Sequence, residues 1–319
     1  MRVTNSMMIS QLMNNINRNL KRMENHQYQL ATGKKLQRPS QDPVGITRSL
    51  QARTELSKLQ QYKRNADDAQ AWLTQTETAL TEMNSLVVRA YELAVDGASG
   101  GKTPEDRQAI AREVEQLMNQ LLEASNSSYA GRQIFGGYNT TEKPFQVRMD
   151  EGQSFLWYNG IKIANLTDPT SQPAVPDGVG SERIEYEIGS GLFMDISMSG
   201  EDVLGVGNDN VYAVFHELYE ALMDGTDSDR IDESIGKLQF QQQEILSHLA
   251  EVGGKTNRLT LIKTRLEMDE MNYTEIKSHV EDVDHEQVIM EFLMAEMVYR
   301  SSLSVGARII QPTLLDFLR

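Results

Sequence analysis

The chain has 319 residues, of which 39% are hydrophobic and 7% aromatic, and its formal net charge is −15. It contains no cysteine, which excludes disulfide bonds, thiolate metal sites and cysteine nucleophiles. The negative charge argues against nucleic acid as a main partner, because binding to phosphates needs clustered cations.

The charge is distributed unevenly between the two ends of the chain. Residues 1–65 carry 12 Lys and Arg against 3 Asp and Glu, whereas residues 267–300 carry 2 against 10. The basic and acidic segments could attract each other, or they could form two independent solvated helix faces. The charges alone leave both interpretations open.

The first residues, Met1 to Ser6, lack the apolar core and small-residue cleavage site of a secretory signal peptide. No stretch approaches the roughly 18 uninterrupted apolar residues of a membrane span. We therefore expect no membrane insertion, and a different export route if the protein leaves the cell.

A heptad pattern predicts a helix over residues 6–31. Its apolar positions alternate at spacings of three and four residues, which keeps them on one stripe of a helix. Several Asn residues fill the polar side and are poor helix formers, so this helix should need a partner. Gly33 should end it. The stripe consists of Ser6, Ile9, Met13, Ile16, Leu20, Met23, Gln27 and Leu30.

A turn-rich loop follows, and Pro43 suits the first turn of a long helix over residues 44–96. Eleven consecutive positions from Leu59 to Ala94 keep the three-four alternation, which strongly indicates a coiled coil or helical bundle. Thr103 as N-cap and Pro104 at the first helical position then predict the start of another helix.

Helical periodicity is lost near residue 130. Asn159-Gly160 lies between two short apolar runs and predicts a β-hairpin, because this dipeptide suits a tight two-residue turn. Residues 184–188 alternate apolar and polar side chains like a half-buried strand. We interpret residues 140–205 as a small β-rich insert.

Helical periodicity returns at about residue 208 and continues to the end of the chain. We expect Gly253-Gly254 to interrupt it. A seam that starts at Leu259 continues in phase through later methionines. The last apolar positions are Met290, Met294, Met297, Ile309, Ile310, Leu314, Leu315, Phe317 and Leu318.

These elements predict a mainly α fold, an elongated multi-helix coiled-coil bundle formed by both chain ends, with the β-rich insert at the far end. Residues 1–43 plus 275–319 should form a terminal coiled-coil assembly domain. Residues 44–139 plus 206–274 should form a helical rod domain, and residues 140–205 the inserted domain.

Motifs for catalysis or metal binding are missing from the sequence. The five histidines include no pair spaced by four residues and no His-Glu-x-x-His. The glycine-spaced run at residues 200–207 lacks the strand and helix of a dinucleotide site. The stripe of Met290, Met294 and Met297 is more typical of a packing surface than of a cofactor site. We predict no enzyme activity, no cofactor and no metal.

Motifs near both ends resemble the flagellin superfamily. Residues 29–36 followed by residues 40–45 resemble the N-terminal signature, and residues 253–259 resemble the turn and helix start of the C-terminal half. Residues 307–318 resemble the terminal motif. Within the superfamily, residues 131–137 followed by Lys143-Pro144-Phe145 resemble the hook-associated junction proteins more than the flagellins.

This resemblance implies a structural adaptor subunit that joins a hook-associated ring to the flagellin filament, with filament flagellin itself as the alternative. It implies an extracellular location at the hook–filament junction and export through the flagellar type III apparatus. The implied partners are neighbouring copies in a ring, the other hook-associated junction protein, flagellin, and an export chaperone at the C-terminal helix.

Terminal helices that fold on assembly are also implied. The assembly interface is predicted to comprise Ile9, Met13, Ile16, Leu20, Met23, Leu30, Met290, Met294, Met297, Ile309, Ile310, Leu314, Leu315 and Leu318.

Overall fold

The structure is a computed structural model that describes residues 5–36, 38–99, 101–150, 152–168, 171–175, 183–225 and 228–310. Within these ranges the chain forms seven α-helices, one short 3-10 helix and seven short strands, all paired antiparallel. The predicted fold class, mainly α with a β-rich insertion, is confirmed.

The helices are α1 (Asn5–Thr32), α2 (Pro43–Ala98), α3 (Pro104–Ser125), α4 (Gly200–Leu204), α5 (Val211–Asp224), α6 (Ser228–Glu281) and α7 (His285–Ile310), and the 3-10 helix is η1 (Gly207–Asp209). The strands are β1 (Ser128–Tyr129), β2 (Arg132–Gln133), β3 (Phe145–Asp150), β4 (Gln153–Tyr158), β5 (Ile161–Asn165), β6 (Glu185–Gly189) and β7 (Leu192–Asp195).

The chain divides into two compact units. The first comprises residues 1–60 and 267–319, and the second comprises residues 61–266. The first unit therefore contains both chain ends, and the second contains all the strands. The three-part division predicted above, with borders at residues 43, 139, 205 and 274, stays a prediction.

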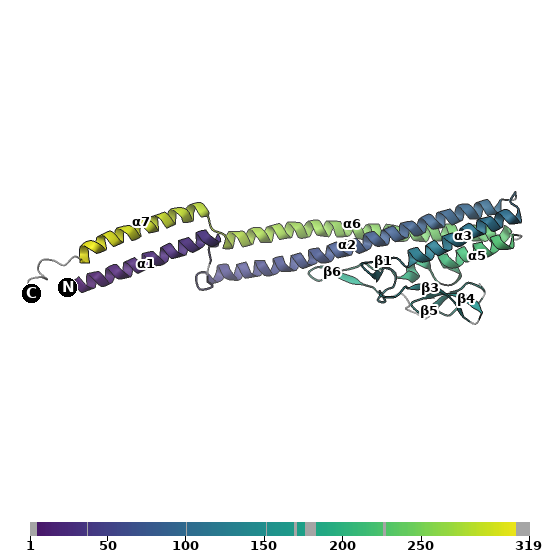
Figure 1. The fold of residues 1–319 in the computed structure, drawn as a ribbon, viewed down its shortest axis with the longest axis horizontal. Helices are drawn as coiled ribbons and strands as arrows, with labels where there is room; N and C mark the ends of the chain where they lie inside the picture. Colours follow the sequence, from purple (N-terminus) through teal and green to yellow (C-terminus); the bar gives the residue numbers. More distant parts are fainter. Residues whose placement is uncertain are drawn as a thin grey trace, which may run out of the picture. The chain divides into compact units, whose positions relative to one another are not determined.

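In the first unit, α1 and α7 pack side by side (Figure 1). As predicted, α1 ends at Gly33, which adopts a left-handed φ of 66° and donates its N–H to the Gln29 carbonyl at 2.8 Å. The Asp284 carboxylate accepts from the N–H groups of Glu286 and Gln287 and starts α7. The seam predicted to run on from Leu259 is therefore broken between Glu281 and His285.

The second unit is built on a heptad seam between long helices. On α6, fully buried side chains recur every seven residues at Ile231, Leu238, Ile245, Val252 and Leu259. On α2, the predicted stripe is buried at every position from Ala66 to Ala94. This packing confirms the bundle prediction for this part of the chain.

The predicted interruption at Gly253-Gly254 is wrong, because α6 continues through both residues. A glycine in a helix interior costs about 1 kcal/mol relative to alanine. Val252 and Leu259 are buried on either side, and their packing offsets that cost.

The second unit also contains the predicted helix start at Thr103. The Thr103 hydroxyl accepts from the N–H of Asp106 at 3.2 Å, and the Asp106 carboxylate accepts from the N–H of Thr103 at 3.1 Å. One turn later the buried Arg107 donates to the carbonyl oxygens of Gly97 and Gly225. Its guanidinium thus provides hydrogen-bond donors for carbonyl groups at the C-terminal ends of α2 and α5, where the helix dipoles favour a positive charge.

Strands β3 to β7 share one continuous core with α2, α3, α5 and α6. The predicted hairpin at Asn159-Gly160 joins β4 to β5, and both turn residues have positive φ, 48° and 84°. The predicted strand over residues 184–188 appears as β6. Within the β3-β4-β5 sheet, the buried face carries Phe145, Leu156, Tyr158 and Ile163.

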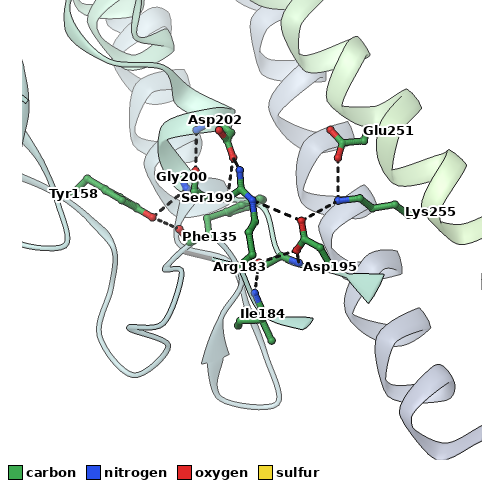
Figure 2. A network of polar contacts seen from close by, with 11 residues as sticks. Phe135, Tyr158, Arg183, Ile184, Asp195, Ser199, Gly200, Asp202, Glu251 and Lys255 are labelled. Carbon is green, nitrogen blue, oxygen red and sulfur yellow. Dashed lines mark hydrogen bonds and ion pairs between the residues drawn. The ribbon is translucent and has the colours of Figure 1, made fainter. Parts of the chain in front are cut away.

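A polar network ties the β6–β7 hairpin to α6 (Figure 2). The Asp195 carboxylate at the end of β7 lies 3.6 Å from both the Arg183 guanidinium and the Lys255 ammonium of α6. Arg183 also pairs with Asp202 at 2.8 Å, and Lys255 pairs with Glu251 at 2.9 Å. The hairpin is thus fixed to the long helix by charge as well as by apolar packing.

Candidate functional site

The paired terminal helices form the candidate site, an assembly surface. Half-buried side chains on α1 repeat at spacings of three and four, which defines a heptad seam toward α7. The α7 seam follows the same rule. The seam residues are Ile9, Leu12, Ile16, Asn19, Met23, His26 and Leu30 on α1, and Val288, Phe292, Ala295, Tyr299, Ser302 and Gly306 on α7.

Three contacts define the antiparallel register of this pair. The Asn19 amide donates to the Ser302 hydroxyl at 3.3 Å, and the His26 ring lies 3.5 Å from the Glu291 carboxylate. Leu12 packs so close to Gly306 that a β-carbon there would lie 2.9 Å from the Leu12 Cδ2 atom. Two of these three contacts are polar. They therefore determine how α1 and α7 are aligned, but they bury little apolar surface.

The predicted stripe on α1 is divided by the structure. Ile9, Ile16, Met23 and Leu30 lie in the seam with α7 and are half-buried. Met13 and Leu20, by contrast, are exposed, because the seam passes through the residues one position earlier, at 12, 19 and 26. Sequence reasoning followed apolar character and so missed the polar pair at 19 and 26.

The predicted positions Met290, Met294 and Met297 on α7 are all exposed in the single chain. They belong to a broader apolar face whose members are each between 45% and 66% exposed. Soluble monomers rarely expose large contiguous apolar patches, so this face is suited to binding a partner. It comprises Ile289, Met290, Leu293, Met294, Met297, Val298, Leu303 and Val305.

The remaining predicted interface residues cannot be placed on this surface. Ile309 and Ile310 lie at the end of α7, where the structure describes the backbone but not these side chains. Leu314, Leu315 and Leu318 lie outside the described residues. Their role in assembly stays a prediction.

A carboxylate hub closes the base of the α1–α7 pair. Glu281, at the end of α6, is only 4% exposed. Its carboxylate accepts two hydrogen bonds from the Arg53 guanidinium, at 2.6 and 2.8 Å, and one from the Ser49 hydroxyl. The Lys34 ammonium lies 3.3 Å from it and 2.6 Å from Asp282. We call Glu281 with Lys34, Ser49 and Arg53 the Glu281 hub.

The hydrogen bonds from Arg53 lower the pKa of Glu281 by more than burial of the carboxylate raises it. Together with the hydrogen bonds from Ser49 and Lys34, they bring this pKa to about 2. Hydrogen bonding to Lys34 and Ser278 likewise lowers the pKa of Asp282. Both groups are therefore anionic at neutral pH.

Backbone contacts reinforce the Glu281 hub. The Lys35 N–H donates to the Glu281 carbonyl at 2.6 Å, and the Val283 N–H donates to the Gly33 carbonyl at 3.2 Å. An isolated β-bridge pairs Lys34 with Asp282. The segment after α1 is thus joined to the segment before α7 by main chain and side chains together.

These contacts favour one of the two interpretations of the uneven charge. Lys34 and Arg53 of the basic segment bind Glu281 and Asp282 of the acidic segment. The two segments therefore attract each other within the first unit. Sequence reasoning identified this charge asymmetry but not the residues that meet, because Ser49 and Glu281 are 232 positions apart.

The described residues contain no group of three or more His, Cys, Asp or Glu side chains placed to hold a metal ion. None of the described helices is long and apolar enough to cross a membrane.

Comparison with known proteins gives consistent matches. Residues 3–140 match the family described as the bacterial flagellin N-terminal helical region. The chain is 23% identical over 318 residues to flagellar hook-associated protein 3 of Salmonella typhimurium, a match that covers 95% of each chain. It is 24% identical over 281 residues to flagellin FlaB1 of Treponema pallidum, a match that covers 88% of this chain and 85% of the relative.

Among solved structures, the flagellar junction protein FlgL from Legionella pneumophila has a similar fold. The TM-score is 0.55 at 13% sequence identity, and the match covers 75% of this chain and 100% of that chain. The fold and these matches define a flagellin-like structural protein. Within that class the chain is similar, along nearly its whole length, to flagellar hook-associated protein 3. The resemblance stated from the sequence motifs is confirmed.

Proposed function

We propose that this protein is the structural adaptor that joins the hook-associated ring to the flagellin filament. The observation that carries the proposal is its similarity to hook-associated protein 3 over 95% of both chains. The terminal helices support it physically, because α7 presents an apolar face that a single chain leaves in water. Such a face favours association with other subunits.

The proposed mechanism is association driven by burial of the terminal helices. Each large apolar side chain that becomes buried contributes about 1.5–3 kcal/mol. The exposed residues Met13 and Leu20 on α1, and the methionines of α7, would contact neighbouring copies in the ring. Ordering of the terminal helices on assembly offsets part of this gain. We also propose that Leu314, Leu315 and Leu318 take part in assembly.

The proposed partners above and below the ring are flagellin and the other hook-associated junction protein. The apolar α7 needs cover before assembly, which supports binding of an export chaperone at the C-terminal helix. The proposed location is the extracellular hook–filament junction, reached through the flagellar type III apparatus. The adaptor acts by binding alone and catalyses no reaction.

The test is electron microscopy of flagella from a strain that lacks this gene. Hooks without filaments, with flagellin monomer shed into the medium, are expected. Complementation with the intact gene should restore filaments and serves as the control. Filaments of normal length and number on the deletion strain would overturn the proposal.

Filament flagellin is the second candidate, and the similarity to flagellin FlaB1 of Treponema pallidum favours it. The two candidates differ in self-assembly. A flagellin should form long polymers from purified protein seeded with filament fragments, whereas an adaptor should stop after capping the fragment ends. Long polymers of this chain alone would favour flagellin.

A further inference from the structure

The ion pairs of the first unit leave a surplus of positive charge on α1, the loop after it and the first turns of α2. Lys34 and Arg53 bind Glu281, but six other cations form no ion pair within the described residues. The acids of the same stretch, Glu24 and Asp42, do not balance them. The unpaired cations are Arg18, Lys21, Arg22, Lys35, Arg38 and Arg48.

Two of these cations line a groove. It lies between α1 and the loop at residues 38–41 and has a volume of about 560 Å³. Lys21 and Arg38 outnumber its single acid, Glu24, and Tyr28 and Ala31 supply apolar surface. The groove is therefore suited to a helix face that carries a carboxylate beside an apolar side chain.

Such a face lies on the last turns of α6. Met268, Met271 and Glu275 occupy one side of the helix at spacings of three and four residues. Met271 is 67% exposed, and the Glu275 side chain is 71% exposed. Apart from His279, one turn away on the same helix, Glu275 has no ionic partner within the described residues.

We propose that this α6 face of one copy docks in the α1 groove of a second copy, with Glu275 between Lys21 and Arg38 and Met271 against Tyr28. The occupant is a second copy because the chain itself carries both complementary surfaces, opposite in charge and each lacking a cover. The inference rests on the proposed function, since it describes how copies associate in the ring.

The two surfaces differ, so the contact is heterologous. Each docked copy presents its own free groove or free α6 face to the next copy. Repetition of such a contact generates a closed ring or an open helix, whereas a contact between identical patches ends at a dimer. The proposed contact thus accounts for a many-membered assembly.

Cysteine pairs test the contact directly, because the natural chain contains no cysteine. Lys21→Cys and Glu275→Cys are made in separate full-length copies, co-expressed in the deletion strain, and oxidised in isolated flagella. A disulfide-linked dimer is expected. Lys21→Cys paired with Glu244→Cys, which replaces an exposed acid elsewhere on α6, should give none and is the matched control.

The outcomes separate the contact from the proposed function. Normal filaments on the strain that co-expresses Lys21→Cys and Glu275→Cys, without any disulfide-linked dimer, would overturn the contact while the adaptor role stands. A benzophenone attached to the thiol of the Lys21→Cys variant should cross-link to residues 267–281 of another copy. A cross-link to a different flagellar protein would assign the groove to that protein and also overturn the proposal.

Charge reversal gives an independent measurement. Lys21→Glu with Arg38→Glu should weaken incorporation into flagella about tenfold, as expected for loss of a charge pair with added repulsion. Glu275→Lys in the same chain should restore much of it, because the reversed charges attract again. Reversal without effect on incorporation would contradict the contact.

Discussion

Both units contain the same heptad pattern, but their seam residues are buried to different degrees. In the second unit, the seam residues of α2 and α6 are buried and apolar, so this unit has a complete core. In the first unit, the seam between α1 and α7 is half-buried and contains Asn19, His26 and Ser302, while large apolar residues face outward. The pattern shows where a helix packs, but the residues at its positions decide whether the packing is sufficient within one chain.

The largest effect should come from the complete core. Phe215→Ala on α5 removes a fully buried ring and should lower the free energy of unfolding by about 3–5 kcal/mol. Chemical denaturation of the purified chain measures this. Phe240→Ala on α6 removes a ring that is 54% exposed and should change little. Equal losses for the two variants would contradict the distinction between core and surface.

The Glu281 hub should stabilise the first unit by up to about 3 kcal/mol, because the pKa of the Glu281 carboxyl is lowered from 4.5 to about 2. A lowered folded-state pKa stabilises the fold above pH 4.5, and this contribution is lost as the pH falls from 4.5 toward 2. Glu281→Gln should abolish this pH dependence.

Hydrogen exchange of the Lys35 and Val283 amides as a function of pH measures the effect, because both amides bond across the hub. Glu286→Gln, at an exposed acid on α7, is the control and should leave the profile unchanged. Unaltered exchange in Glu281→Gln would show that the hub does not hold the two segments together.

A smaller change, of opposite sign, is expected at the glycine pair of α6. A β-carbon at Gly253 would meet open space, so Gly253→Ala should stabilise the second unit by about 0.5–1 kcal/mol. Thermal unfolding measures the gain. Gly225→Ala, at a left-handed φ of 67°, should instead destabilise. A loss of stability in Gly253→Ala would indicate a need for flexibility at this point of the helix.

The smallest effect on the free chain is expected on the outward face of α7. Met294→Ala with Met297→Ala should change the unfolding free energy of the monomer by less than about 0.5 kcal/mol, because both side chains are exposed. The same variant should reduce incorporation into flagella, which immunoblots of isolated flagella measure. Unchanged incorporation would remove this face from the assembly surface.

Local signals in the sequence were sufficient for much of the fold. The stripe on α2, the N-cap at Thr103 and the hairpin at Asn159-Gly160 each depend on neighbouring residues, and each is found as expected. The interruption predicted at Gly253-Gly254 was wrong because the low helix propensity of glycine is a weaker effect than the packing of the buried seam on either side.

The candidate site was less predictable because it depends on contacts between distant residues. Apolar character alone predicts that Met13 and Leu20 pack against the partner helix. In the structure, Asn19 and His26 lie in the seam instead, because they form polar contacts with Ser302 and Glu291 of α7. Nothing near Glu281 in the sequence indicates that Ser49 and Arg53 will meet its carboxylate. Pairing at such separations follows from the fold as a whole.

The antiparallel pairing of the first and last helices also sets an order of events. The Asn19–Ser302 hydrogen bond joins residues 283 positions apart, so α1 leaves the ribosome long before its partner exists. Closure of so long a loop is slow compared with local helix packing. The terminal pair is therefore expected to form last, after the second unit has folded, and each new chain passes through a period in which α1 has no intramolecular partner.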